Sequence, residues 1–101
     1  MDIQKNEIYS MKLNSGEELV AKVTELIDNN GFITIEEPVS IAPGPQGMGL
    51  IPSMFTGDPK APTKLNYKSI AIIAATEDSI KTKYIQATTG LSVPNKKLIL
   101  G

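Results

Sequence analysis

Hydrophobic and polar residues alternate with a period of two near the start of the chain. In the stretch IYSMKL, Tyr9, Met11 and Leu13 fall on one side of an extended backbone. This alternation is typical of a β-strand with one buried face. We therefore expect a strand over residues 8–13.

The next stretch, residues 15–27, has two interpretations. As a helix, it begins with Ser15 and Glu18 as a capping box and continues with an apolar stripe at helical spacing. As a strand, it alternates acceptably, but Glu25 falls on the apolar face unless a bulge intervenes. Scored by local pattern alone, the helix is favoured.

A hairpin signal follows directly. Asn30-Gly31 predicts a tight turn, because both residues adopt positive φ at little cost, and residues 32–35 are rich in strand formers. Such a hairpin requires a strand on each side of the turn. The two local signals therefore conflict, and the residues in this window leave both interpretations open.

Residues 42–64 are dense in proline and glycine. Within this segment, residues 47–55 are too apolar for a free linker and predict a fourth strand. Pro52 restricts that strand to an edge or a bulge, because proline cannot donate to a ladder. Residues 57–64 are then expected to form a solvent-exposed loop.

The sequence predicts a fifth strand over residues 65–75. Residues 70–75 (IAIIAA) are apolar on both faces, as expected for a fully buried strand.

A helix is predicted over residues 76–89. Thr76 is the expected N-cap, acidic residues occupy the first turn, and Gly90 ends the helix. The apolar stripe consists of Ile80, Tyr84 and Ala87. Residues 91–101 are expected to add a short strand.

Composition narrows the possible functions. The chain of 101 residues has no cysteine and no histidine, which excludes a disulfide framework, thiolate metal sites and serine–histidine catalysis. We therefore expect no enzyme activity, metal or cofactor. No apolar run resembles a signal peptide or a membrane span, so a cytoplasmic protein is expected. Net charge is −1 and all ten basic residues are lysine.

The stretch MKLNSGEELVAKVTELIDNNGFITIEEPVSI resembles the first conserved motif of Sm-like (LSm) proteins, in particular those of phage (cyanophage) type. Ala21 stands where the family usually has glycine, and a small residue there avoids a clash in a bent strand. The matching positions are Leu13, Gly16, Ala21, Val23, Leu26 and Asp28. The resemblance implies that residues 17–27 are a strand. It also implies one mainly β domain over residues 1–101, a five-stranded, strongly bent barrel with a C-terminal helix over residues 76–89.

Sm-like proteins form rings in which the fourth strand of one subunit pairs with the fifth strand of its neighbour. The resemblance therefore implies a homo-oligomeric ring of five to seven copies, with single-stranded RNA as a partner. The implied interface residues are Met48, Leu50, Ile51, Met54, Phe55, Ile70, Ile72 and Ile73. The implied RNA-binding residues, in the loop between the second and third strands, are Asp28, Asn29, Asn30 and Phe32. The family's Arg-Gly pair is absent, because the chain has no arginine, and its slot is expected near Phe55-Thr56-Gly57.

An alternative function is a phage structural, assembly or adaptor ring that binds protein partners and no RNA. Its expected contact surface is formed by Met48, Leu50 and Met54, together with the helix over residues 76–89. Methionine suits adaptable contacts.

Overall fold

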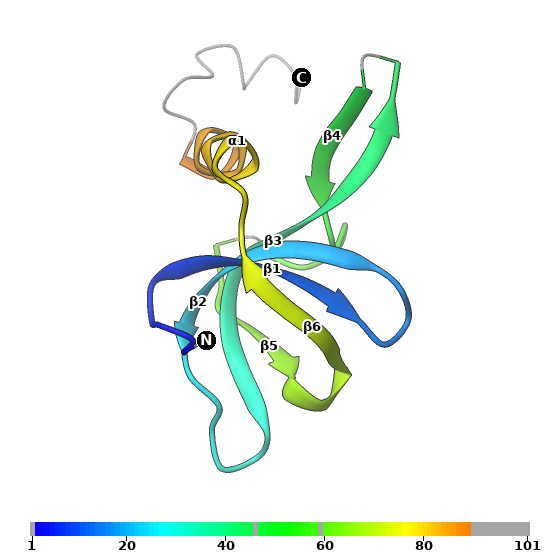
Figure 1. Ribbon diagram of the computed structural model, residues 1–101. Helices are drawn as coiled ribbons and strands as arrows, with labels where there is room; N and C mark the ends of the chain where they lie inside the picture. Colours follow the sequence, from blue (N-terminus) through cyan, green and yellow to red (C-terminus); the bar gives the residue numbers. More distant parts are fainter. Residues whose placement is uncertain (1, 46, 59, 90–101) are drawn as a thin grey trace.

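The computed structural model describes residues 2–45, 47–58 and 60–89 (Figure 1). Its elements in chain order are β1 (Glu7–Leu13), β2 (Glu18–Glu25), β3 (Phe32–Gly44), β4 (Gly47–Pro52), β5 (Thr63–Asn66), the 3-10 helix η1 (Tyr67–Ser69), β6 (Ile70–Ala75) and α1 (Asp78–Thr89). The described chain is therefore mainly β, with one α-helix after the last strand, as the sequence predicted. It has six strands where five were predicted, and the predicted strand over residues 47–55 ends at Pro52. No helix in these residues is long and apolar enough to cross a membrane.

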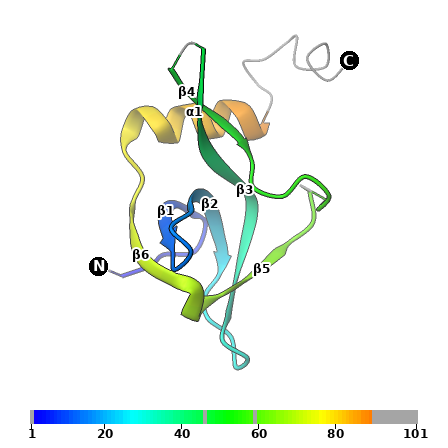
Figure 2. The same ribbon diagram turned by 90° about the vertical axis from the view of Figure 1, so that its right-hand side faces the viewer.

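The strands form one antiparallel sheet in the order β4-β3-β2-β1-β6, and β5 pairs with the beginning of β3. The sheet curls around the core, and η1 links β5 to β6 (Figures 1 and 2). No ladder in the described residues joins β5 to β6, so the sheet stays open. The turn between β2 and β3 lies at one end of the molecule, and α1 lies at the other end beside the β3–β4 hairpin.

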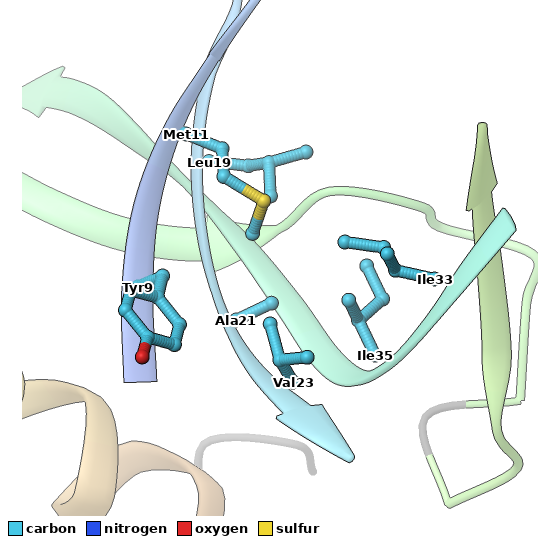
Figure 3. Close-up of a cluster of buried hydrophobic side chains, with 7 residues drawn as sticks. All are labelled: Tyr9, Met11, Leu19, Ala21, Val23, Ile33 and Ile35. Carbon is cyan, nitrogen blue, oxygen red and sulfur yellow. The ribbon is translucent and has the colours of Figure 1, made fainter. Parts of the chain in front are cut away.

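The ambiguous segment is a strand. β2 pairs with β1 in a register that sets Tyr9 opposite Ala21 and Met11 opposite Leu19. Seven buried side chains of β1, β2 and β3 converge inside the curl of the sheet (Figure 3). They are Tyr9, Met11, Leu19, Ala21, Val23, Ile33 and Ile35. Pairing on both edges and burial inside this cluster outweigh the local helix pattern, because a helix here would remove two ladders and three of the seven cluster residues.

β3 is the longest strand and bends in its middle. In the β2–β3 ladder Val20 pairs with Val39 and Lys22 with Glu36, so two residues of β3 face one residue of β2. This is a β-bulge, and Glu37 within it has a φ of +46°. Before the bulge β3 pairs with β5, and after it β3 pairs with β4.

The predicted strand over residues 65–75 is wrong in its extent. β5 begins inside the predicted loop at Thr63, and η1 separates it from β6. The prediction that residues 70–75 are fully buried is also wrong for the single chain. β6 is an edge strand, and the Ile72 side chain is 60% exposed. The prediction of an edge position for Pro52 is confirmed, since it ends β4 at the other edge of the sheet.

The predicted C-terminal helix is confirmed as α1, but its expected cap is not. α1 begins at Asp78, so Glu77 is the residue that flanks it, and the Glu77 carboxylate accepts the N–H of Ser79 at 3.2 Å. Thr76 is instead buried, with its hydroxyl 3.0 Å from that of Ser10. The predicted end at Gly90 and the strand after it lie outside the described residues.

Tyr84 fastens α1 to the bulge in β3. Its hydroxyl donates to the backbone oxygen of Glu36 (2.8 Å) and accepts the backbone N–H of Lys22 (3.1 Å). It therefore bridges two strands where the bulge interrupts their ladder. Its ring packs with Val20 and Val39 in a second buried cluster on the outer face of the sheet. The helix thus completes hydrogen bonding that the sheet lacks.

We expect Tyr84→Phe to destabilise the protein by about 1–3 kcal/mol, because it leaves the Lys22 N–H and the Glu36 oxygen without their partner. Chemical denaturation followed by circular dichroism measures the change. Tyr67→Phe, at a half-exposed side chain, is the matched control and should be neutral. Equal stability of Tyr84→Phe and wild type would show that the bridge contributes nothing.

The raised pKa of Tyr84 also predicts that the folded protein loses stability at high pH. Burial raises the pKa of Tyr84 to about 12 from an ordinary value of 10.0, and the nearby negative Glu37 and Glu36 add to the rise. The folded state thus favours the neutral phenol. The stabilisation that the neutral Tyr84 phenol gives the folded state is complete below pH 10 and is lost as pH rises toward 12. We expect the stability difference between wild type and Tyr84→Phe to shrink over this range; a constant difference would contradict this assignment.

Candidate functional site

The turn between β2 and β3 is organised by one carboxylate. Asp28 Oδ1 accepts the backbone N–H groups of Asn30 (2.8 Å) and Phe32 (3.1 Å). The Asp28 backbone N–H also donates to the Phe32 oxygen (2.8 Å), and the Asp28 backbone oxygen accepts the Gly31 N–H (3.1 Å). Gly31 has a φ of +85°, which glycine adopts without strain. These contacts form the predicted hairpin turn, but the expected positive φ at both turn residues is found at Gly31 and not at Asn30, because the turn closes from Asp28.

Both carboxylate oxygens of the exposed Asp28 have partners within the protein. Its Oδ2 lies 3.4 Å from the Lys64 ammonium. The two backbone N–H groups, and secondarily Lys64, hold the pKa of the Asp28 carboxyl below its usual value. Asp28, predicted as an RNA-binding residue, thus has a structural role in the turn, whereas the side chains of Asn29 and Asn30 are exposed at its tip.

A second turn lies against the first. Asn66 Oδ1 accepts the N–H of Lys68 (2.9 Å) and so begins η1, and the Tyr67 N–H donates to the Gly31 oxygen (2.9 Å). The turn that touches the β2–β3 turn is therefore η1. The slot of the missing Arg-Gly pair, expected near residues 55–57, falls in the loop after β4.

Sequence reasoning missed Tyr67 and Lys68, whereas a charge reversal at Lys64 was already expected to weaken RNA binding. The available signal was the stretch Asn66-Tyr67-Lys68-Ser69, which separates Leu65 from the apolar run that begins at Ile70. Residues 28–32 and 64–68 together are called the turn cluster below.

The turn cluster offers polar groups on an open surface. Phe32 is half-buried and lies opposite Asn66 in the ladder, so only part of its ring is accessible. Beside Asp28 and Lys64 of the turn cluster is an open hollow of about 440 Å³. Its lining residues are Lys5, Glu25, Leu26, Ile27, Asp28, Thr34 and Lys64. Exposed amides, a partly exposed ring and lysines on an open surface suit an extended polar chain better than an enclosed small molecule. No group of three potential metal ligands lies within the described residues.

The predicted interface residues divide into two sets. Ile51, Met54, Phe55 and Ile72 are exposed, whereas Leu50, Ile70 and Ile73 are half-buried. Ile70 and Ile73 pack against the inner cluster, and Leu50 packs against the cluster under α1. Met48 lies in β4, and its side chain is outside the described set. The exposed residues thus follow β4, the loop after it and β6, the two open edges of the sheet.

The chain matches no model of a known protein family, and it matches no curated protein sequence. The Sm-like resemblance therefore stays a prediction, and function has to be argued from the residues and their geometry.

We expect Asp28→Ala to speed amide hydrogen exchange at Asn30 and Phe32, because both N–H groups lose their acceptor. Asp28→Asn keeps an oxygen acceptor and should retain most of the protection at neutral pH. Asp58→Ala is the matched control, since Asp58 makes a similar contact with the Lys60 N–H in another loop. In the wild type, the lowered pKa of Asp28 predicts that this protection persists below its ordinary pKa of 3.8 and is lost as pH falls further. Unchanged exchange in Asp28→Ala would show that the turn forms without its carboxylate.

Proposed function

We propose that the protein assembles into a closed Sm-like ring of five to seven identical subunits that binds single-stranded RNA at the turn cluster. In this assembly, β4 of each subunit pairs with β6 of the next. The observation that carries the proposal is the pair of open, apolar edges of one sheet.

The physical argument for assembly begins with the backbone of the two edge strands. Within the described residues, β4 pairs only with β3 and β6 only with β1, so each has an edge of N–H and C=O groups that faces no strand. Natural proteins protect open edges with charges, or cover or pair them. Neither GMGLIP in β4 nor IAIIAA in β6 contains a charged residue. Pairing with another copy would satisfy these groups.

The two edges differ, so the contact is heterologous: one surface of a subunit meets another surface of its neighbour. Repetition of such a contact gives a ring when the rotation closes and a filament when it does not. The strong curl of the sheet, seen in Figure 2, supports a large rotation between neighbours and hence closure.

The turn cluster supports the RNA part of the proposal. The hydrogen bond from Tyr67 to Gly31 brings the lysines at 64 and 68 near the exposed amides of Asn29 and Asn30. Amides read base edges, lysines neutralise phosphates, and the accessible part of the Phe32 ring offers a surface for a base. Without arginine the phosphate contacts come from lysine alone, so binding should weaken steeply with salt.

A second candidate function, a ring that binds protein partners and no RNA, is favoured by the exposed side chain of Met54. Leu50 does not support it, because it packs under α1. This function predicts no binding of oligonucleotides at any salt concentration.

Assembly is tested by placing a charge on an edge strand. We expect Ile51→Lys, in β4, to lower the particle mass measured by light scattering, because the added ammonium would be buried at the junction. Ile85→Lys, in α1, is the matched control, since both isoleucines are 40% exposed. Dissociation by Ile85→Lys with an intact Ile51→Lys particle would contradict pairing through β4.

RNA binding is tested by reversing one charge in the turn cluster. We expect Lys68→Glu to weaken binding of oligo-uridine or oligo-adenine by about tenfold in fluorescence anisotropy at low salt. Lys83→Glu, on α1, makes the same change of net charge and should leave affinity unchanged. Equal weakening by the two variants, or no binding by the wild type, would contradict an RNA site at the turn cluster.

A further inference from the structure

Two aromatic side chains stand out on the surface of the subunit. Of the five aromatic residues, Tyr9 and Tyr84 are buried and Phe32 is half-buried, whereas Phe55 is 81% exposed and Tyr67 48% exposed. Met54, the residue before Phe55, is also exposed, and extended exposed apolar surface marks interaction sites.

The loop after β4 directs Phe55 outward. The Met54 side chain lies beside Gly57, since a Cβ added at Gly57 would lie 3.6 Å from the Met54 Cβ. Met54 also lines a small recess with Pro38 and Pro52. Phe55 is the more exposed of the two, at 81% against 55% for Met54. Met54 is thus partly covered by its own loop, and the Phe55 ring is the more accessible apolar group for a partner.

The lengths of the two edge strands indicate what Phe55 would meet. β4 (Gly47–Pro52) and β6 (Ile70–Ala75) each contain six residues. Antiparallel pairing with full overlap sets Pro52 of one copy opposite Ile70 of the next, and Gly47 opposite Ala75. Phe55 follows Pro52 by three residues, and Tyr67 precedes Ile70 by three. Both exposed aromatic residues therefore lie just beyond the same end of this pairing, Phe55 in the loop after β4 and Tyr67 in η1.

We propose that Phe55 of each subunit packs against Tyr67 of the next and closes the junction between them. This inference rests on the proposed ring and names the side chains that hold it together. All described ladders of this sheet are antiparallel, so an antiparallel junction continues the sheet from one copy into the next. Offset or edge-to-face packing of two rings favours association beyond the area that it buries.

The test uses the absence of cysteine in the chain, which makes any introduced cysteine the only thiol. Phe55→Cys and Tyr67→Cys proteins are prepared separately and treated with a short bismaleimide, alone and as an equal mixture. We expect covalent dimers in the mixture and few in either protein alone, because the contact joins two different surfaces. The double variant Phe55→Cys/Tyr67→Cys should give a ladder of products up to the full subunit number.

The control pairs Ile85→Cys with Tyr67→Cys. Ile85 is exposed on α1, at the opposite end of the subunit from the turn cluster (Figure 1), and this mixture should stay monomeric on a denaturing gel. In a second measurement, Phe55→Ser should raise the protein concentration at which the ring dissociates by about tenfold.

The outcomes separate the inference from the proposed function. If light scattering shows an assembled wild-type protein but the Phe55→Cys and Tyr67→Cys mixture gives no dimers, the ring stands and this contact is wrong. Dimers formed equally well by Phe55→Cys alone would indicate a twofold contact and overturn the head-to-tail register. A monomeric wild-type protein would overturn both.

Discussion

The bend in β3 is the constraint on which the rest of the structure depends. At the bulge, Glu37 takes a positive φ and two residues of β3 face one of β2. The first half of β3 can therefore line the inner cluster and pair with β5, while the second half leaves the core and pairs with β4. The bulge also interrupts backbone hydrogen bonding between β2 and β3. Tyr84 of α1 supplies a partner to each strand there, which fixes the helix on the outer face.

The two open edges follow from this bend. Because β4 leaves the core with the second half of β3, it does not reach β6, and η1 carries the chain from β5 across the remaining gap. The sheet thus ends in two uncharged strands, at β4 and at β6. The same η1 holds Lys68 and Tyr67 against the β2–β3 turn. The surface proposed for RNA and the surface proposed for the neighbouring subunit therefore adjoin each other at a single short turn.

Three elements were predicted from neighbouring residues alone. These are β1 from its alternation of apolar and polar residues, the β2–β3 hairpin from Asn30-Gly31, and α1 from its apolar stripe. Local pattern favoured the wrong structure for β2, because Leu19 and Val20 fit a helical stripe as well as a strand covered on both faces. Local pattern did not predict η1, because the position of η1 depends on a hydrogen bond between Tyr67 and Gly31, two residues that are distant in sequence. For the same reason it found Asn29 and Asn30 in the candidate site but not Lys68. The role of Tyr84 depends on a bulge that no residue of α1 reveals.

Amide hydrogen exchange, resolved by residue with NMR, tests most directly whether the two edges are paired between copies. In an isolated subunit, about every second N–H of β4 and β6 points away from its only neighbouring strand. Our account predicts that these outward N–H groups exchange as slowly as those bonded within the subunit, in β4 and in β6 alike. Exchange of the outward groups at the rate of an unstructured peptide, at protein concentrations where binding is measured, would contradict it.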